Sequence, residues 1–165
     1  MANCDTSTID TGKSVLAQWV AGCGDDDYTA LTYLSFGAMN TKSLGFTGTT
    51  ADTTNDLSGA DTSTIVVRRD GELSVSGFQT TNDSVISAQN QLINYYHTEL
   101  TAGRQPSVWL KISGDNYPRV YYIFAVMTDY NEAFNTDDPR TIEFMFKPTD
   151  TGVSGVAAVN VEDPV

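Results

Sequence analysis

Residues 64–78 constrain the fold most, because they contain two β-prone segments separated by Asp70-Gly71. Asp-Gly between such segments is a strong hairpin signal, since a type I′ turn needs positive φ at both central residues. A turn at this point would place Arg69 opposite Glu72, which pairs opposite charges across the two strands. The sequence therefore predicts a β-hairpin over residues 64–78.

A helix is predicted directly after this hairpin, at about residues 83–101. Asn82 or Asp83 can cap its start, and Gly103 followed by Pro106 is a typical exit. Apolar and large side chains at helical spacing form the face that a sheet would bury: Val85, Ile86, Gln89, Leu92, Ile93, Tyr96 and Leu100.

The rest of the ordered chain is predicted to be β-structure, in strands near residues 28–36, 39–46, 107–113, 119–128 and 141–147. The segment 119–128 has apolar or aromatic residues at both odd and even positions, so both faces of its strand must be covered. A half-exposed sheet in a monomer would not provide that cover.

Composition limits the class of protein. The chain has 165 residues, enough for one domain with a substantial core. Its 21 acidic residues against 9 basic ones argue against a nucleic-acid binder that neutralises phosphates. No apolar run reaches the roughly 18 residues of a membrane span, and the first residues do not have the pattern of a signal peptide, so synthesis in the cytoplasm is expected.

The sequence offers no catalytic or metal-binding constellation. Cys4 and Cys23 are expected to be free thiols, although a disulfide between them remains open. His97 is the one histidine and is interpreted as a surface or packing residue. Three consecutive aspartates at 25–27 indicate a solvated turn rather than a calcium site. We therefore expect no enzymatic activity and no cofactor.

Residues 47–62 are unusual in composition. They are rich in Thr and Asp, contain no Lys or Arg, and include one large apolar side chain, Leu57. A loop this long within a domain is usually either functional or disordered, and the well-marked strands on both sides favour the functional reading.

The order of these elements resembles the tail tube (major tail) protein of long, non-contractile siphophage tails. The resemblance covers residues from about Tyr28 to Pro148. It depends on the strand pair around the Thr/Asp-rich loop, the 68–72 hairpin, the strand 74–78 entering the helix, and the closing strand 142–148.

The resemblance implies a tail-tube fold. This fold is mainly β, a β-sandwich or barrel-like arrangement of two packed antiparallel sheets, with one short flanking α-helix. It divides the chain into an N-terminal arm (1–27), a tail-tube domain (28–148) and a C-terminal extension (149–165).

The resemblance also implies a function. Such proteins form hexameric rings that stack into a hollow tube, through which double-stranded DNA passes. The expected partners are other copies of the chain and the tape measure, tail tip and tail terminator proteins. The expected location is the virion tail, after synthesis in the host cytoplasm.

The resemblance further implies that a neighbouring subunit covers one face of the strand 119–128 and that the Thr/Asp-rich loop reaches the neighbouring ring. Its candidate contact residues are Thr49, Asp52, Thr54, Asp56, Leu57 and Asp61. Candidate basic partners on the neighbouring subunit are Lys42, Arg68, Arg69 and Arg119. Two alternatives stay open: a monomeric β-sandwich ligand-binding or adhesin module that uses exposed Trp109 or tyrosines, and the tube protein of a contractile tail or a type VI secretion system.

Overall fold

The structure is a computed structural model that describes residues 15–37, 39–52, 64–79, 83–114, 119–134 and 136–163. These residues form eight strands and one helix: β1 (Val15–Ala21), β2 (Leu34–Ser35), β3 (Met39–Asp52), β4 (Thr64–Phe78), α1 (Asp83–Thr101), β5 (Ser107–Gly114), β6 (Val120–Ala133), β7 (Thr141–Pro148) and β8 (Val159–Glu162). No helix in this part of the chain is long and apolar enough to cross a lipid bilayer.

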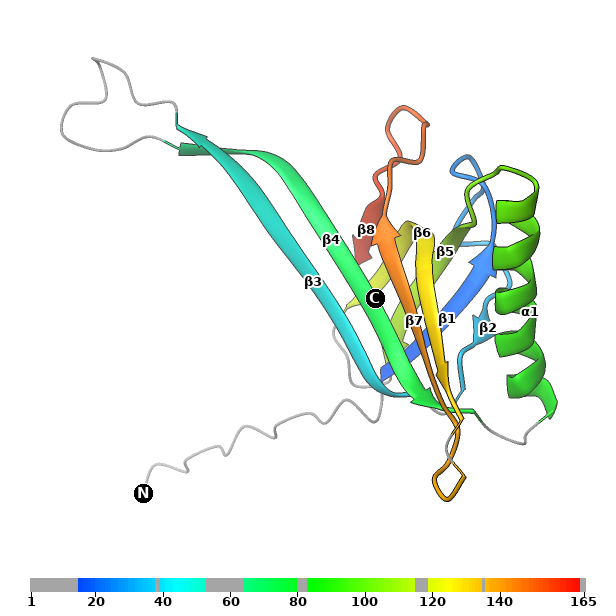
Figure 1. Cartoon of the computed structure of the whole chain (residues 1–165). Helices are drawn as coiled ribbons and strands as arrows, with labels where there is room; N and C mark the ends of the chain where they lie inside the picture. Colours follow the sequence, from blue (N-terminus) through cyan, green and yellow to red (C-terminus); the bar gives the residue numbers. More distant parts are fainter. Residues whose placement is uncertain are drawn as a thin grey trace, which may run out of the picture.

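The strands form one antiparallel sheet in the order β2-β1-β5-β6-β7-β4-β3, and β8 pairs with the start of β6. The prediction of a mainly β fold with antiparallel strands and one flanking helix is confirmed. The sequence suggested two packed sheets, whereas the strands form one hydrogen-bonded sheet that curves around the core (Figure 1). Because of this curvature, β1 and β4 both contribute residues to the same apolar cluster. Strand twist makes such curvature the usual state of a long sheet.

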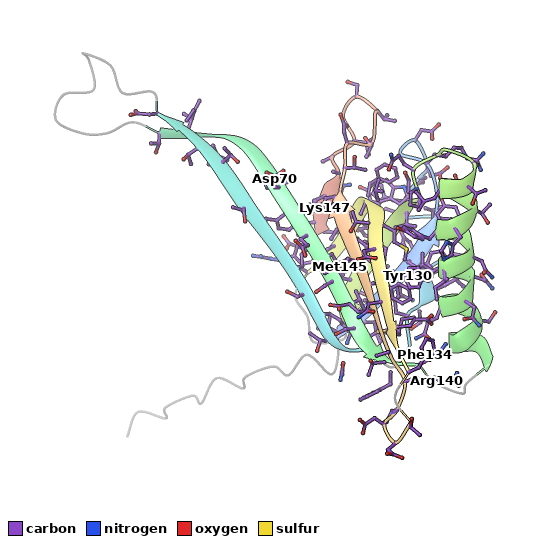
Figure 2. The ribbon with its side chains drawn as sticks, viewed as in Figure 1. Asp70, Tyr130, Phe134, Arg140, Met145 and Lys147 are labelled. Carbon is purple, nitrogen blue, oxygen red and sulfur yellow. The ribbon has the colours of Figure 1, made fainter. Side chains whose placement is uncertain are left out.

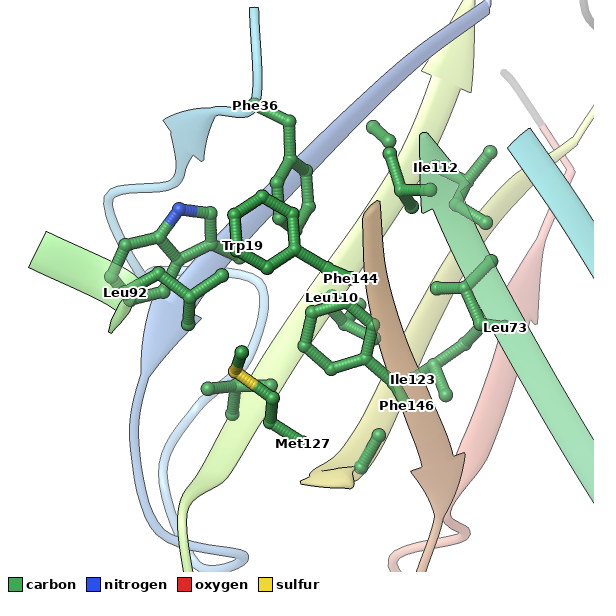
Figure 3. Packing of buried hydrophobic residues seen from close by; sticks show 14 of the residues in the cluster. Trp19, Phe36, Leu73, Leu92, Leu110, Ile112, Ile123, Met127, Phe144 and Phe146 are labelled. Carbon is green, nitrogen blue, oxygen red and sulfur yellow. The ribbon is translucent and has the colours of Figure 1, made fainter. Parts of the chain in front are cut away.

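The main core lies between the concave side of this sheet and α1. Leu92 of the helix is fully buried beside Trp19 and Phe36, while Phe144 and Phe146 of β7 occupy the centre (Figure 3). The alternation predicted for 107–113 and 141–147 is confirmed, because Val108, Leu110, Ile112, Ile142, Phe144 and Phe146 are all buried in this cluster.

The helix is also confirmed over 83–101. Gly103 has φ +70°, and the amides of Gly103 and Arg104 donate to the carbonyls of Leu100 and Glu99, which is the Schellman arrangement. Gln89 is buried with Leu92, and Tyr96 is half-buried, but Leu100 is 48% exposed, so its predicted burial is wrong. The predicted cap at Asn82 or Asp83 and the side chains of Val85 and Ile86 lie outside the described residues.

A second aromatic cluster covers the other face of β5 and β6. Trp109, Tyr122 and Phe124 are buried there. The cover comes from segments 22–33 and 149–158 of the same chain: the ring of Tyr28 lies 5.1 Å from that of Trp109, and Trp109 Nε1 donates to the Cys23 carbonyl at 2.9 Å. The prediction that β6 is buried on both faces is confirmed, but the inference that a neighbouring subunit must supply the cover is wrong.

The predicted hairpin at Asp70-Gly71 is also wrong. Strand β4 runs without a turn from Thr64 to Phe78 and pairs along its length with β3, where Asp70 lies opposite Thr47 and Gly71 opposite Phe46. Gly71 is not among the glycines with positive φ. Pairing two long strands satisfies many more backbone hydrogen bonds than a hairpin of two short segments, so the tertiary ladder overrides the local turn signal.

Other element boundaries differ from the prediction. Only Leu34–Ser35 of the predicted 28–36 strand is β-structure. Residues 47–52 of the predicted loop belong to β3, while 53–62 lie outside the described residues. Strand β6 extends to Ala133, five residues beyond the end of the predicted 119–128 strand. The sheet also includes β1 and β8, which come from the predicted arm and extension on either side of 28–148.

Candidate assembly surface

Strands β3 and β4 form a ribbon that projects from the rest of the sheet (Figure 1). Strand β4 pairs with β7 only between Leu73 and Phe78, whereas its residues 64–72 pair with β3 alone. A two-stranded ribbon on its own is marginally stable in water, and unpaired strand edges are templates for pairing with another chain. The ribbon is therefore the part of the described fold that gains most from a partner.

The base of the ribbon is held by a close packing of Phe46 over Gly71. A Cβ added to Gly71 would lie 2.7 Å from Phe46 Cε1 and 2.9 Å from Pro148 Cγ, so only glycine leaves room for the ring. The guanidinium of Arg69 lies 5.2 Å from the centroid of the same ring, a distance suited to a cation–π contact. These contacts join the ribbon to the end of β7.

The far end of the ribbon exposes apolar side chains. Ile65 is 52% exposed and Val66 is 66% exposed. The pairing register shifts between Thr49 and Thr50, opposite this end, and such an irregularity increases local twist. Ile65 and Val66 are consecutive in β4, so they lie on opposite faces of the ribbon, and each face therefore exposes an apolar β-branched side chain beside an unpaired strand edge.

Two of the predicted loop contacts lie on this ribbon. Thr49 and Asp52 are exposed in β3, opposite Arg68 and Thr64 respectively. The other predicted contacts, Thr54, Asp56, Leu57 and Asp61, lie outside the described residues. The role of this group in contacting a neighbouring ring remains a prediction.

The predicted basic partners lie in different surroundings. Arg69 is exposed over Phe46, and Arg119 is exposed just before β6. Only the backbone of Arg68 is described. Lys42 is half-buried at the base of β3, where its Nζ donates to the Met39 carbonyl at 3.0 Å and burial lowers the pKa of its ammonium group.

Lys42 lines a groove of about 390 Å³ at the open end of the core. Its apolar wall consists of Val15, Leu44, Leu73, Ile112 and Tyr121. Ile112 and Leu73 lie on the β4 side of the core, away from Leu92 of the helix (Figure 3). The groove thus opens where the first residues of β1 approach β3 and β4.

A second exposed apolar site lies at the opposite end of the sheet, at the β6–β7 turn. Phe134 is 66% exposed under the guanidinium of Arg140, which lies 5.6 Å from its ring centroid, and Phe78 is 41% exposed at the end of β4. Figure 2 shows Phe134 and Arg140 at the end of the molecule away from Asp70 on the ribbon. Sequence reasoning missed this site; an aromatic residue within a polar, acidic turn was the available signal.

The sheet face opposite the core carries mainly polar side chains across β6, β7 and β4, and Met145 is the one apolar residue of the two rows that follow. One cross-strand row contains Asp129, Met145 and Ser74, and the next contains Asn131, Glu143 and Ser76. All six side chains are at least partly exposed. An antiparallel sheet with one solvent-exposed face typically has small polar and acidic side chains on that face and large apolar side chains on the other.

The described residues contain no group of three or more His, Cys, Asp or Glu placed to hold a metal ion. The Nε2 atom of His97 lies 2.7 Å from the Tyr130 hydroxyl, so this histidine joins the helix to β6. In the 25–27 turn, Asp27 Oδ1 accepts hydrogen bonds from the Thr29 hydroxyl and amide, and these bonds lower the pKa of Asp27. Cys23 is exposed, and Cys4 lies outside the described residues.

The sequence matches no protein-family model and no curated protein. Solved structures do match. A chain from the tail of an empty gene transfer agent particle with C6 symmetry gives a TM-score of 0.60 at 13% identity, covering 95% of this chain and 100% of that one. A chain from the six-fold symmetrised baseplate of the anti-feeding prophage gives 0.60 at 8% identity, covering 95% and 97%.

A chain of the SPP1 tail tube gives a TM-score of 0.58 at 11% identity, covering 94% of this chain and 80% of that one. These identities are low, so the likeness concerns the fold, and it extends over nearly the whole chain. The chain has the fold of phage tail tube proteins.

Proposed function

We propose that this chain is a structural virion protein that assembles into stacked hexameric rings and forms the hollow tube of a phage tail. The observation that carries the proposal is the projecting β3–β4 ribbon with its exposed apolar end, on a fold otherwise closed around its own core. A subunit of this shape has a fully buried core but leaves one edge of its ribbon without a paired strand. Such a subunit is suited to assemble through contacts at that edge. Its proposed partners are further copies of itself and the tape measure, tail tip and tail terminator proteins.

The polar face of β6, β7 and β4 is the surface that we assign to the channel. Asp129 and Glu143 would present carboxylates to passing double-stranded DNA, and the serines of β4 would add small polar groups. Like charges repel, so an acidic wall discourages DNA from binding as it passes. The chain as a whole carries a net charge of −12, in keeping with this role.

A structural role agrees better with the described residues than the adhesin alternative. Trp109, the side chain nominated for ligand binding, is fully buried, and Tyr122 is buried beside it. The tube protein of a contractile tail or a type VI secretion system remains the second candidate, since a chain from a baseplate matches this chain with the same TM-score as a chain from a tail.

Negative-stain electron microscopy of the concentrated full chain tests the proposal. We expect hollow tubes of uniform width with a regular ring repeat. A protein that stays monomeric at high concentration, and also when supplied with tail tip proteins, would contradict the proposal.

The channel assignment has its own test. Tubes of the double variant Asp129→Lys, Glu143→Lys should retain double-stranded DNA at low salt, whereas wild-type tubes should not. A matched control reverses one exposed charge in the 25–27 turn, Asp25→Lys, and should behave like wild type. Equal retention by the channel variant and this control would show that the polar face does not line the channel.

A further inference from the structure

The groove beside Lys42 lies between two strands from opposite sides of the sheet, β1 and β3. Its walls include Val15 at the start of β1 and residues 40–44 of β3. Among the described residues, β2 and the residue after it bond to β1 only from Ala17 onward, so that side of Val15 and Leu16 has no strand beside it. The side of β3 that faces away from β4 also has no described strand beside it. The groove therefore lies where two open sheet edges come near each other.

This gap leaves apolar surface and strand edges uncovered. Val15, Leu44 and Tyr121 on its wall are half-buried, and covering the rest of their apolar surface would be favourable. Open strand edges pair readily with other chains, and proteins commonly cover them with a segment of their own. The volume of about 390 Å³ is more than twice the roughly 150 Å³ of a cavity that holds a benzene ring, so the groove can accept a branched aliphatic side chain and the backbone that carries it.

The segment that precedes β1 has a sequence suited to this gap. Residues 1–14 lie outside the described residues and join β1 at Val15, which is itself a wall of the groove. The run Asp10-Thr11-Gly12 matches a three-residue hairpin loop, in which a type I turn is followed by a glycine in the left-handed region. Such a loop would turn the chain back beside the start of β1 and place Ile9 opposite Lys13.

The register of that loop determines the direction of the Ile9 side chain. Ile9 and Lys13 would share one face as cross-strand neighbours, and Lys13 shares its face with Val15 because side chains alternate along a strand. Val15 lies on the same face of β1 as the buried Ala17 and Trp19. Ile9 would therefore point toward the core beside Val15, and it is the one branched aliphatic residue of this segment.

We propose that residues 6–9 add a strand to the open edge at the start of β1 and insert Ile9 into the groove of the same subunit. Charge supports this occupant, because Asp10 follows Ile9 and the groove presents the ammonium group of Lys42. Lys42 is half-buried, so water screens its charge incompletely and a carboxylate beside it is favourable. The inference concerns the single subunit and goes beyond the proposed function, since the contact forms without a tube.

Hydrogen exchange of the full chain, at a concentration where it is monomeric, tests the added strand. Peptides that cover residues 14–17 should exchange at least tenfold faster in Ile9→Asp than in wild type, because the added strand is lost. The matched control is Thr8→Asp, the neighbouring residue whose side chain would point away from the groove, and it should change the rate less than twofold. Equal rates in wild type and Ile9→Asp would overturn the proposal.

The charge contact has a separate readout in the same measurement. Asp10→Lys should raise the exchange rate of these peptides severalfold, and adding Lys42→Asp should restore part of the protection. An Asp10→Lys variant that exchanges like wild type would overturn the pairing of Asp10 with Lys42.

A cross-linking experiment identifies the subunit that supplies the occupant. In a background with Cys4→Ser and Cys23→Ser, the chain carries Ser7→Cys and Thr41→Cys, since position 41 lines the groove. A short bismaleimide should join the two thiols within one chain, which mass spectrometry detects in a species that migrates as a monomer. The control combines Ser7→Cys with Leu100→Cys at the end of the helix, and should give at least tenfold less internal link.

Each outcome of the cross-linking decides the assignment. A link between two chains would overturn the same-subunit contact and identify a second copy as the source of the strand. Equal linking to positions 41 and 100, or no link to position 41, would show that the segment does not occupy the groove. None of these measurements requires a tube, so their failure leaves the proposed function standing, and a chain that forms no tubes leaves this inference standing.

Discussion

Replacing Gly71 with alanine should weaken the junction between the ribbon and the sheet. The new methyl group would lie 2.7 and 2.8 Å from two carbons of the Phe46 ring and 2.9 Å from Pro148 Cγ. Carbon atoms normally pack about 3.5–4.0 Å apart, so the ring must move. Overpacking of this kind costs about 1–3 kcal/mol, and displacing the ring also weakens its contact with Arg69, which is worth about 0.5–1 kcal/mol at an exposed site.

Urea and thermal unfolding of the monomer measure this cost. At about 2–4 °C per kcal/mol for a domain of this size, the melting temperature should fall by several degrees. Gly45→Ala is the matched control in the same ribbon, because its added Cβ would meet nothing within 4 Å. Gly45→Ala should leave the melting temperature unchanged or raise it slightly.

A double-mutant cycle with Phe46→Ala identifies the cause. If the clash with the ring is responsible, removing the ring should recover at least about 0.5 kcal/mol of the loss, while the contact with Pro148 keeps the recovery incomplete. If Gly71 instead occupied a turn with positive φ, the cost of the alanine would not depend on Phe46. Strictly additive free energies would therefore refute the packing explanation.

Three further predictions concern the body of the fold. Leu92→Ala should lower the free energy of unfolding by about 2–5 kcal/mol in urea titration, because this side chain is fully buried between helix and sheet. Trp109→Phe should cost about 1–3 kcal/mol by the same measurement, since it leaves the Cys23 carbonyl without its indole donor. Arg104 donates to both carboxylate oxygens of Glu99, and these hydrogen bonds lower the pKa of that group. The stabilisation by this pair is therefore present above the ordinary pKa of a glutamate and is lost as pH falls through the lowered value. Protection factors of the amides at the end of the helix, measured by hydrogen exchange and corrected for the intrinsic rate, should fall over that acidic range in wild type and not in Glu99→Gln.

The sequence predicts the elements whose evidence is local. The 3.6-residue spacing before Gly103 locates the helix, and the alternation in 107–113 and 141–147 locates β5 and β7 with their buried faces. In these segments the period of the apolar residues matches the geometry of the element, so one segment is enough to identify it.

Long-range strand pairing explains why the predicted hairpin at Asp70-Gly71 is wrong. Asp70-Gly71 has the composition of a turn, but its neighbours pair with β3 from Gly77 opposite Met39 to Thr64 opposite Asp52. A glycine is needed at position 71 because the ring of Phe46 packs against it. Phe46 is 25 residues away in sequence and reaches Gly71 only after β3 and β4 have paired. No local pattern distinguishes a glycine needed for a turn from one needed for close packing.

The candidate assembly surface could be predicted only in part. The composition of 47–62 pointed to the ribbon end, although β3 continues through residue 52. The groove could not be foreseen, because its walls come from β1, β3, β4, β5 and β6, and only the fold brings them together. The same is true of the aromatic cluster around Trp109, whose cover comes from two segments without regular patterning.

The ladder between β4 and β7 has a mechanical consequence for a ribbon that joins two copies. Antiparallel hydrogen bonds lie perpendicular to the strands, so tension applied along the ribbon reaches the body of the subunit as shear across the six residue pairs from Leu73–Phe146 to Phe78–Thr141. Shear loads these bonds together, whereas peeling would break them one after another. A tube built through such ribbons would resist stretching through backbone pairing, and would bend where the ribbon leaves β7.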